Sequence, residues 1–115
     1  MDLEIKNKIA LVTGSSSGIG LSTAIELIKN GTKVWICARN ESKLLEAEEI
    51  IKKETKENPF IFQVDVSKEK EITKMIDHIQ EKHSKIDILI NNAGRAQAGG
   101  VLDTNTDQWI DMFNL

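Results

Sequence analysis

Residues 13–20 read TGSSSGIG, and this stretch decides the fold. An apolar run at residues 9–12 precedes it, and apolar residues at helical spacing follow it over residues 19–30. A short apolar run of this kind is typical of a strand that is buried on both faces of a sheet. The glycines and serines therefore lie in the turn between a buried strand and a helix.

Apolar runs and amphipathic segments continue to alternate along the chain. Further buried strands are predicted at residues 34–38, 60–64 and 86–90. Helices are predicted at residues 41–58, after an N-cap at Ser67, and from about residue 106. Regular alternation of strand and helix predicts an α/β fold, in which a doubly wound parallel sheet carries helices on both faces, as in Rossmann-like proteins.

Composition limits the partners that the chain can have. Its 115 residues are enough for one small domain, and its formal net charge of −3 argues against nucleic acid or an anionic membrane as a partner. No apolar run approaches the length of a membrane span, and no signal peptide is recognisable. A single cysteine, Cys37, indicates a reducing, cytoplasmic compartment. No metal site is expected, because His78 and His83 are off the helical spacing of paired metal ligands.

The glycine- and serine-rich turn is expected at the carboxyl edge of the sheet, where folds of this class bind ligands. Gly14 can adopt backbone angles that are closed to other residues. Gly18 and Gly20 lack a Cβ atom, so we expect a phosphate to approach backbone N–H groups at the positive end of the helix. The serine hydroxyls at residues 15–17 add hydrogen-bond donors. The turn is therefore predicted to bind an anion.

The spacing Gly-x-x-x-Gly-x-Gly, with Thr13 in front of it, resembles the first motif of the short-chain dehydrogenase/reductase family. A second motif of that family, Asn-Asn-Ala-Gly, is matched by residues 91–94 directly after the fourth predicted strand. The resemblance covers the chain from Asn7 onward. It implies a sheet with strand order 3-2-1-4 and an oxidoreductase that transfers a hydride between a nicotinamide and a carbonyl or alcohol substrate.

The resemblance also implies roles for individual residues. In the family, the residues that match Asp65 and Val66 contact the adenine, although Asp65 would equally suit a plain turn. The Asn-Asn-Ala-Gly stretch lines the nicotinamide side and steadies the central sheet. The predicted cofactor-binding residues are Thr13, Gly14, Ser15, Ser16, Ser17, Gly18, Ile19, Gly20, Arg39, Asp65, Val66, Asn91, Ala93 and Gly94.

Arg39 bears on the choice of cofactor. NAD-selective dinucleotide folds place an acidic residue at the end of the second strand to bond the ribose 2′-hydroxyl. Here that position reads Ala38-Arg39, and an arginine there can bind the 2′-phosphate of NADP. NADP(H) is therefore the preferred cofactor, with NAD(H) as the alternative. Arg39 could instead only cover the end of the sheet.

The chain departs from the family pattern in its catalytic residues. The family uses a tyrosine, a lysine, a serine and an asparagine, but this sequence contains no tyrosine. The register of the family places the whole tetrad beyond Leu115. We therefore expect residues 1–115 to be a partial dinucleotide-binding domain, truncated after the fourth strand, whose parent is a homo-oligomeric enzyme. The chain alone is expected to be inactive. The alternatives are a non-catalytic dinucleotide-binding module and an interaction fragment.

Overall fold

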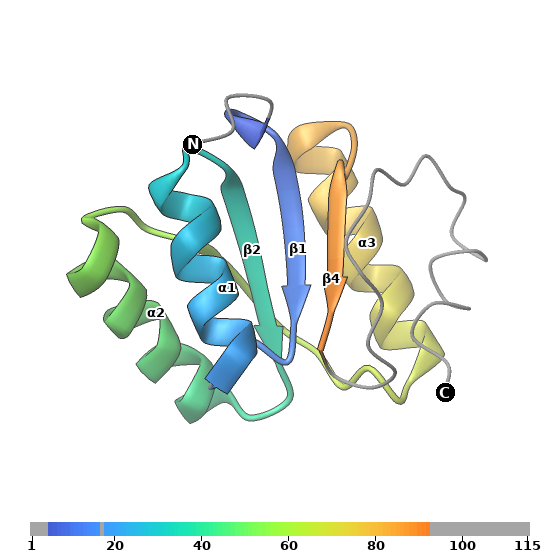
Figure 1. Cartoon of the computed structure of the whole chain (residues 1–115). Coiled ribbons are helices and arrows are strands. Elements are labelled where there is room, and N and C mark those ends of the chain that lie inside the picture. Colours follow the sequence, from blue (N-terminus) through green and yellow to red (C-terminus); the bar gives the residue numbers. More distant parts are fainter. Residues whose placement is uncertain (1–4, 17, 93–115) are drawn as a thin grey trace.

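A computed structural model of the chain describes residues 5–16 and 18–92 (Figure 1). Strands and helices alternate throughout this part of the chain. The strands are β1 (Ile9–Thr13), β2 (Lys33–Ala38), β3 (Phe60–Gln63) and β4 (Ile88–Asn91). The helices are α1 (Gly18–Lys29), α2 (Glu41–Thr55) and α3 (Glu69–His83). None of these helices is long and apolar enough to cross a membrane.

The four strands form one parallel sheet with the order β3-β2-β1-β4. Helices α1 and α2 cover one face of the sheet and α3 covers the other (Figure 1). This arrangement confirms the predicted Rossmann-like α/β fold and its strand order. Because all strands run in the same direction, their carboxyl ends meet at one edge of the sheet.

Each face of the sheet has its own apolar core, because alternate side chains of a strand point to opposite faces. On β1, Leu11 packs on the side of α3, and the neighbouring Val12 packs on the side of α1 and α2. The buried α3 residues are Ile72, Met75, Ile76 and Ile79. The buried residues of α1 and α2 on the other face are Ala24, Ile28, Leu44, Ala47 and Ile51. The continuous apolar run of β1 thus reflects burial on both faces.

Some element boundaries differ from the prediction. Helix α3 begins after Lys68, not after an N-cap at Ser67, because the Ser67 hydroxyl donates to the Asp65 carboxylate at 2.6 Å instead of capping the helix. Helix α2 ends three residues early, where Lys56 adopts a left-handed φ of 63°. The helix predicted from about residue 106 lies outside the described residues.

Asp87, directly before β4, is hydrogen-bonded to the first residue of β1, a role that the sequence did not predict. Its carboxylate accepts a 2.8 Å hydrogen bond from the Ile9 N–H, and its own N–H donates to the Ile9 carbonyl at 2.8 Å. Lys85 Nζ lies 3.2 Å from the same carboxylate. Burial disfavours the charged form, but the Ile9 N–H and Lys85 together hold the pKa of Asp87 below its usual range. Strand β4 begins at Ile88 and not at residue 86 as predicted, and at Asp87 the Ile9 N–H bonds to the side-chain carboxylate and not to a backbone carbonyl.

Replacing Asp87 tests this link. Asp87→Ala is expected to lower the free energy of unfolding by about 1.5–3 kcal/mol, because it removes a hydrogen bond to a charged group and leaves the Ile9 N–H without its acceptor. The carboxylate contributes fully above the unfolded pKa of about 3.9, and its contribution is lost as the pH falls below that value. Urea denaturation at pH 7 and at lower pH measures both effects.

Lys85→Ala is the matched control. The Lys85 side chain is 70% exposed, so its loss should cost at most about 1 kcal/mol. Equal losses for the two variants, or an Asp87→Ala penalty that does not shrink in acid, would contradict the role given to Asp87.

Candidate functional site

The turn between β1 and α1 lies at the carboxyl edge of the sheet (Figure 1). It follows β1, whose neighbours in the sheet are β2 and β4. Thr13, the last residue of β1, is in register with Cys37 of β2 and with Asn91 of β4. The ends of these three strands therefore come together around the turn. Several of the predicted site residues are thus brought to one edge of the sheet from distant parts of the sequence.

The backbone conformations of two glycines determine the path of the turn. Gly14 and Gly18 adopt left-handed φ values of 62° and 61°, which L-residues rarely adopt. A Cβ atom on Gly18 would meet no described atom within 4 Å, so this side of the turn is open. The space beside the first residue of α1 is compatible with the predicted approach of an anion, which stays a prediction.

Gly20 has a packing role that the sequence did not predict. It is buried, and a Cβ atom there would lie 2.9 Å from the carbonyl carbon of Gly14 and even closer to the carbonyl oxygen. The space that a side chain would need is filled by the backbone of the turn itself. The absence of a side chain at Gly20 therefore allows α1 to pack against the turn, while the approach of a phosphate at Gly20 stays a prediction.

The Thr13 side chain joins β1 to β4. Its hydroxyl donates to Asn91 Oδ1 at 2.7 Å and accepts from the Asn92 N–H at 3.0 Å. Thr13 and Asn91 are both buried. The two family motifs are thus in direct contact, and Asn91 has the structural role that was one of its two predicted functions.

The expectation that each serine offers its hydroxyl to a ligand is wrong for Ser15. Its side chain is fully buried, and its hydroxyl donates to the Val12 carbonyl at 2.9 Å. The same oxygen accepts from the Cys37 N–H at 3.2 Å. Ser16 is half-buried, and Ser17 lies outside the described residues. Ser15 can contribute to a ligand site only through its backbone.

Arg39 and Ile19 are exposed members of the predicted set that carry large side chains. Ile19, in the first turn of α1, is 78% exposed, which is unusual for so large an apolar side chain. Arg39 follows β2 directly and is also exposed. Its backbone carbonyl accepts a 3.1 Å hydrogen bond from Gln63 Nε2 at the end of β3. This hydrogen bond fixes the backbone from which the guanidinium side chain extends.

Asp65 closes a local turn after β3. Its carboxylate accepts hydrogen bonds from the Ser67 hydroxyl and from the Ser67 N–H, the latter at 3.0 Å. These hydrogen bonds, and then the positive charges of Lys68 and Arg39, hold the pKa of Asp65 below its usual range. The structure therefore supports the turn role of Asp65, while its contact with adenine stays a prediction. Val66 packs at the margin of the α3-side core.

The remaining predicted residues, Ala93 and Gly94, lie outside the described residues. Within the described part of the chain, no group of three or more His, Cys, Asp or Glu side chains could hold a metal ion. Cys37 is buried, and burial raises the pKa of its thiol to about 12, so it is not a nucleophile.

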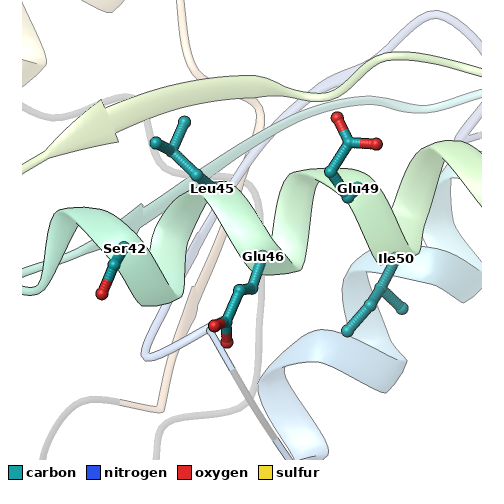
Figure 2. Close-up of a pocket in the computed structure, with 5 residues that line it drawn as sticks. All are labelled: Ser42, Leu45, Glu46, Glu49 and Ile50. Carbon is teal, nitrogen blue, oxygen red and sulfur yellow. The ribbon is translucent and has the colours of Figure 1, made fainter.

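A shallow depression of about 520 Å³ lies on the outer side of α2 (Figure 2). Five residues of this one helix line it: Ser42, Leu45, Glu46, Glu49 and Ile50. None of the predicted site residues takes part. Its apolar side chains Leu45 and Ile50 are partly exposed, and the side chains of Glu46 and Glu49 point to opposite sides of the helix, so these polar groups do not converge as those of ligand sites do (Figure 2).

The chain resembles known proteins along almost its whole length. The profile of a family described as "short chain dehydrogenase" matches residues 8–115. The human protein named dehydrogenase/reductase SDR family member 11 is 39% identical over 111 residues, which cover 96% of this chain and 43% of the human protein. An uncharacterized oxidoreductase of Staphylococcus saprophyticus is 34% identical and covers 98% of this chain and 48% of its own length. The chain thus spans somewhat less than half the length of these curated relatives.

Similar solved structures carry either nicotinamide cofactor. L-sorbose reductase from Gluconobacter frateurii, solved with NADPH and L-sorbose, is 31% identical with a TM-score of 0.74, and the match covers 96% of this chain and 42% of that one. An NADH-dependent reductase solved with NAD is 32% identical with a TM-score of 0.70, and the match covers 82% and 39%. Structural similarity therefore does not decide between the two cofactors.

The packing of Gly20 gives a direct test of the turn. Gly20→Ala is expected to lower the free energy of unfolding by about 1–3 kcal/mol, because the added methyl group collides with backbone that cannot move without shifting the turn. Chemical denaturation monitored by circular dichroism measures the loss. Ser22→Ala, at an exposed position of the same helix, should be neutral or slightly stabilising. An unchanged midpoint for Gly20→Ala would show that the turn does not pack as described.

Proposed function

The chain belongs to the short-chain dehydrogenase/reductase family, and from that premise we propose that it is the N-terminal, cofactor-binding part of an NAD(P)-dependent oxidoreductase. The full-length protein would transfer a hydride between the nicotinamide and a small carbonyl or alcohol substrate. The chain's share of the length of its relatives, 43% and 48% for two of them, supports this division. The nicotinamide supplies the hydride chemistry, and the chain supplies the binding site.

The observation that carries the proposal is the open glycine turn at the start of α1. Gly14 and Gly18 adopt left-handed backbone angles, and no described atom lies within 4 Å of the place where a Gly18 side chain would begin. The first N–H groups of a helix have no acceptor within the helix, and the helix dipole is positive there. The turn therefore suits the diphosphate of a dinucleotide, with N–H groups as the donors. Because the Ser15 hydroxyl is buried and bonded within the protein, Ser15 would contribute to this role only through its backbone.

Arg39 is proposed to select the cofactor. It is exposed, it follows β2 at the same edge of the sheet, and its charge acts on Asp65 in the neighbouring turn. A guanidinium group here could bind the 2′-phosphate of NADP(H) with two parallel hydrogen bonds. NAD(H), which lacks that phosphate, would lose these contacts.

The proton needed in the reaction is proposed to come from residues beyond this chain. Reduction of a carbonyl places negative charge on the oxygen, so a proton donor must lie within hydrogen-bond reach. The sequence has no tyrosine, which is the donor that the family uses. The lack of a tyrosine also favours a second candidate function. If no catalytic part is joined to the chain, it would be a dinucleotide-binding module without catalysis.

Two further properties belong to the same proposal. The full-length protein would assemble as a homo-oligomer, as the family resemblance implies. It would act in the cytoplasm, where the single buried thiol of Cys37 would stay reduced.

Cofactor choice gives the first test of this function. In the full-length protein, NADPH is expected to bind about ten- to a hundred-fold more tightly than NADH, because hydrogen bonds to charged groups contribute about 1.5–3 kcal/mol. Arg39→Ala should remove most of this difference while leaving NADH affinity nearly unchanged. Isothermal titration calorimetry measures the dissociation constants, and equal values for the two cofactors in the unmodified protein would reject the role of Arg39.

Catalysis by the chain alone gives the second test. The 115-residue chain should oxidise NADPH no faster than the background in the presence of ketones, aldehydes or 3-oxoacyl thioesters. The reason is that loss of general acid assistance alone typically costs about 10²–10⁴-fold in rate. Gly14→Asp, which places a negative side chain in the turn, serves as the control. Turnover that survives purification and disappears in Gly14→Asp would refute the proposal that catalysis needs residues outside the chain.

A further inference from the structure

The Ser15 hydroxyl holds the glycine turn against β2. The residue is fully buried although it lies in a turn, where side chains are usually exposed. Its oxygen lies 2.9 Å from the Val12 carbonyl, 3.2 Å from the Cys37 nitrogen and 3.4 Å from the Cys37 carbonyl. One side chain therefore contacts both the end of β1 and the backbone of the neighbouring strand.

These contacts restrain the turn in two ways. The bond to Val12 spans three residues and tightens the reversal of the chain as it leaves β1. The contacts with Cys37 span 22 residues of sequence and tie the turn to β2. On the opposite side, Thr13 ties the beginning of the turn to β4. Buried hydroxyl groups thus hold the turn from both neighbouring strands.

The same stretch of β2 leads directly to Arg39. Cys37 is two residues before Arg39, and the intervening Ala38 carbonyl accepts a 3.0 Å hydrogen bond from the Val64 N–H. Gln63 then holds the Arg39 carbonyl. The turn and the backbone of Arg39 are therefore both held at the end of β2, the turn through Ser15 and Arg39 through the separate hydrogen bonds of Gln63 and Val64.

We propose that Ser15 is a positioning residue for the diphosphate of the cofactor. Its buried hydroxyl would not touch the ligand, but it holds the backbone at Ser15 against β2 and so restrains the beginning of the turn, beside which the diphosphate would bind. This inference rests on the proposed function, because it assigns Ser15 a task within the same site. A turn released from β2 would have to be ordered again each time that a ligand binds, at a cost in affinity.

The test compares ligands with and without a diphosphate. The full-length Ser15→Ala variant should bind ADP-ribose about three- to ten-fold more weakly, the loss expected when one net hydrogen bond no longer orders the turn. Its affinity for adenosine 2′-monophosphate, which lacks the diphosphate, should stay within the error of the measurement. Isothermal titration calorimetry with both ligands gives the two dissociation constants and therefore the ratio of the two affinities.

Thr32→Ala is the matched control. Thr32 is also buried, and its hydroxyl also donates to a backbone carbonyl, that of Ile5 at 2.9 Å, but at the amino edge of the sheet. It should lower stability as much as Ser15→Ala does and leave the ratio of the two affinities unchanged. If Ser15→Ala fails to fold, Ser15→Cys keeps the shape of the side chain with weaker hydrogen bonds and should change the ratio in the same direction.

The outcomes separate the inference from the proposed function. A selective loss of ADP-ribose affinity in Ser15→Ala, absent in Thr32→Ala, supports the positioning role. Equal loss for both ligands, or no loss for either, overturns that role and leaves the proposed function intact. An unmodified full-length protein that binds neither ligand overturns the proposed function, and the inference fails with it.

Discussion

The contact between Gly20 and the Gly14 carbonyl is the constraint on which the rest of the structure depends. The backbone of the turn occupies the space in which a side chain at position 20 would lie. Because of this close packing, α1 begins almost where β1 ends, and its first N–H groups lie at the carboxyl edge of the sheet. The left-handed conformations of Gly14 and Gly18 make the tight reversal feasible. The proposed dinucleotide site at this edge therefore depends on how closely these backbone segments approach each other.

Buried polar side chains hold this geometry from the strands around it. Thr13 and Ser15 use their hydroxyl groups within the protein, one towards β4 and the other towards β2. At the opposite edge of the sheet, Asp87 joins the first residue of β1 to the start of β4. Strand β1 is thus fixed at both ends, and the apolar layers on its two faces fill the space between. Gly14, Gly18 and Arg39 stay exposed at this edge, and these are the residues to which ligand recognition is assigned in the proposed function.

The sequence was sufficient to predict the described strands and helices and their order in the sheet. The periodicity of apolar residues shows which segments are buried, and the family that the two motifs resemble implies the strand order. The sequence did not predict which hydrogen-bond partner a polar side chain takes when both local and distant partners are within reach. The Ser67 hydroxyl bonds to Asp65 and so leaves α3 without the predicted cap. Ser15 bonds to a residue 22 positions away, and Asp87 to one 78 positions away. No spacing rule predicts such contacts, because the fold alone brings these residues together.

The central claim is the proposal that the backbone at Gly14 and Gly18 binds the diphosphate of a dinucleotide. Two-dimensional ¹H–¹⁵N NMR of the chain during titration with NADPH tests it most directly, because each amide reports its own surroundings. The account predicts that the largest shift changes fall on Gly14, Gly18 and their neighbours in the turn, with smaller changes at Arg39. Shift changes that leave the turn untouched and fall instead on the outer side of α2 would contradict it.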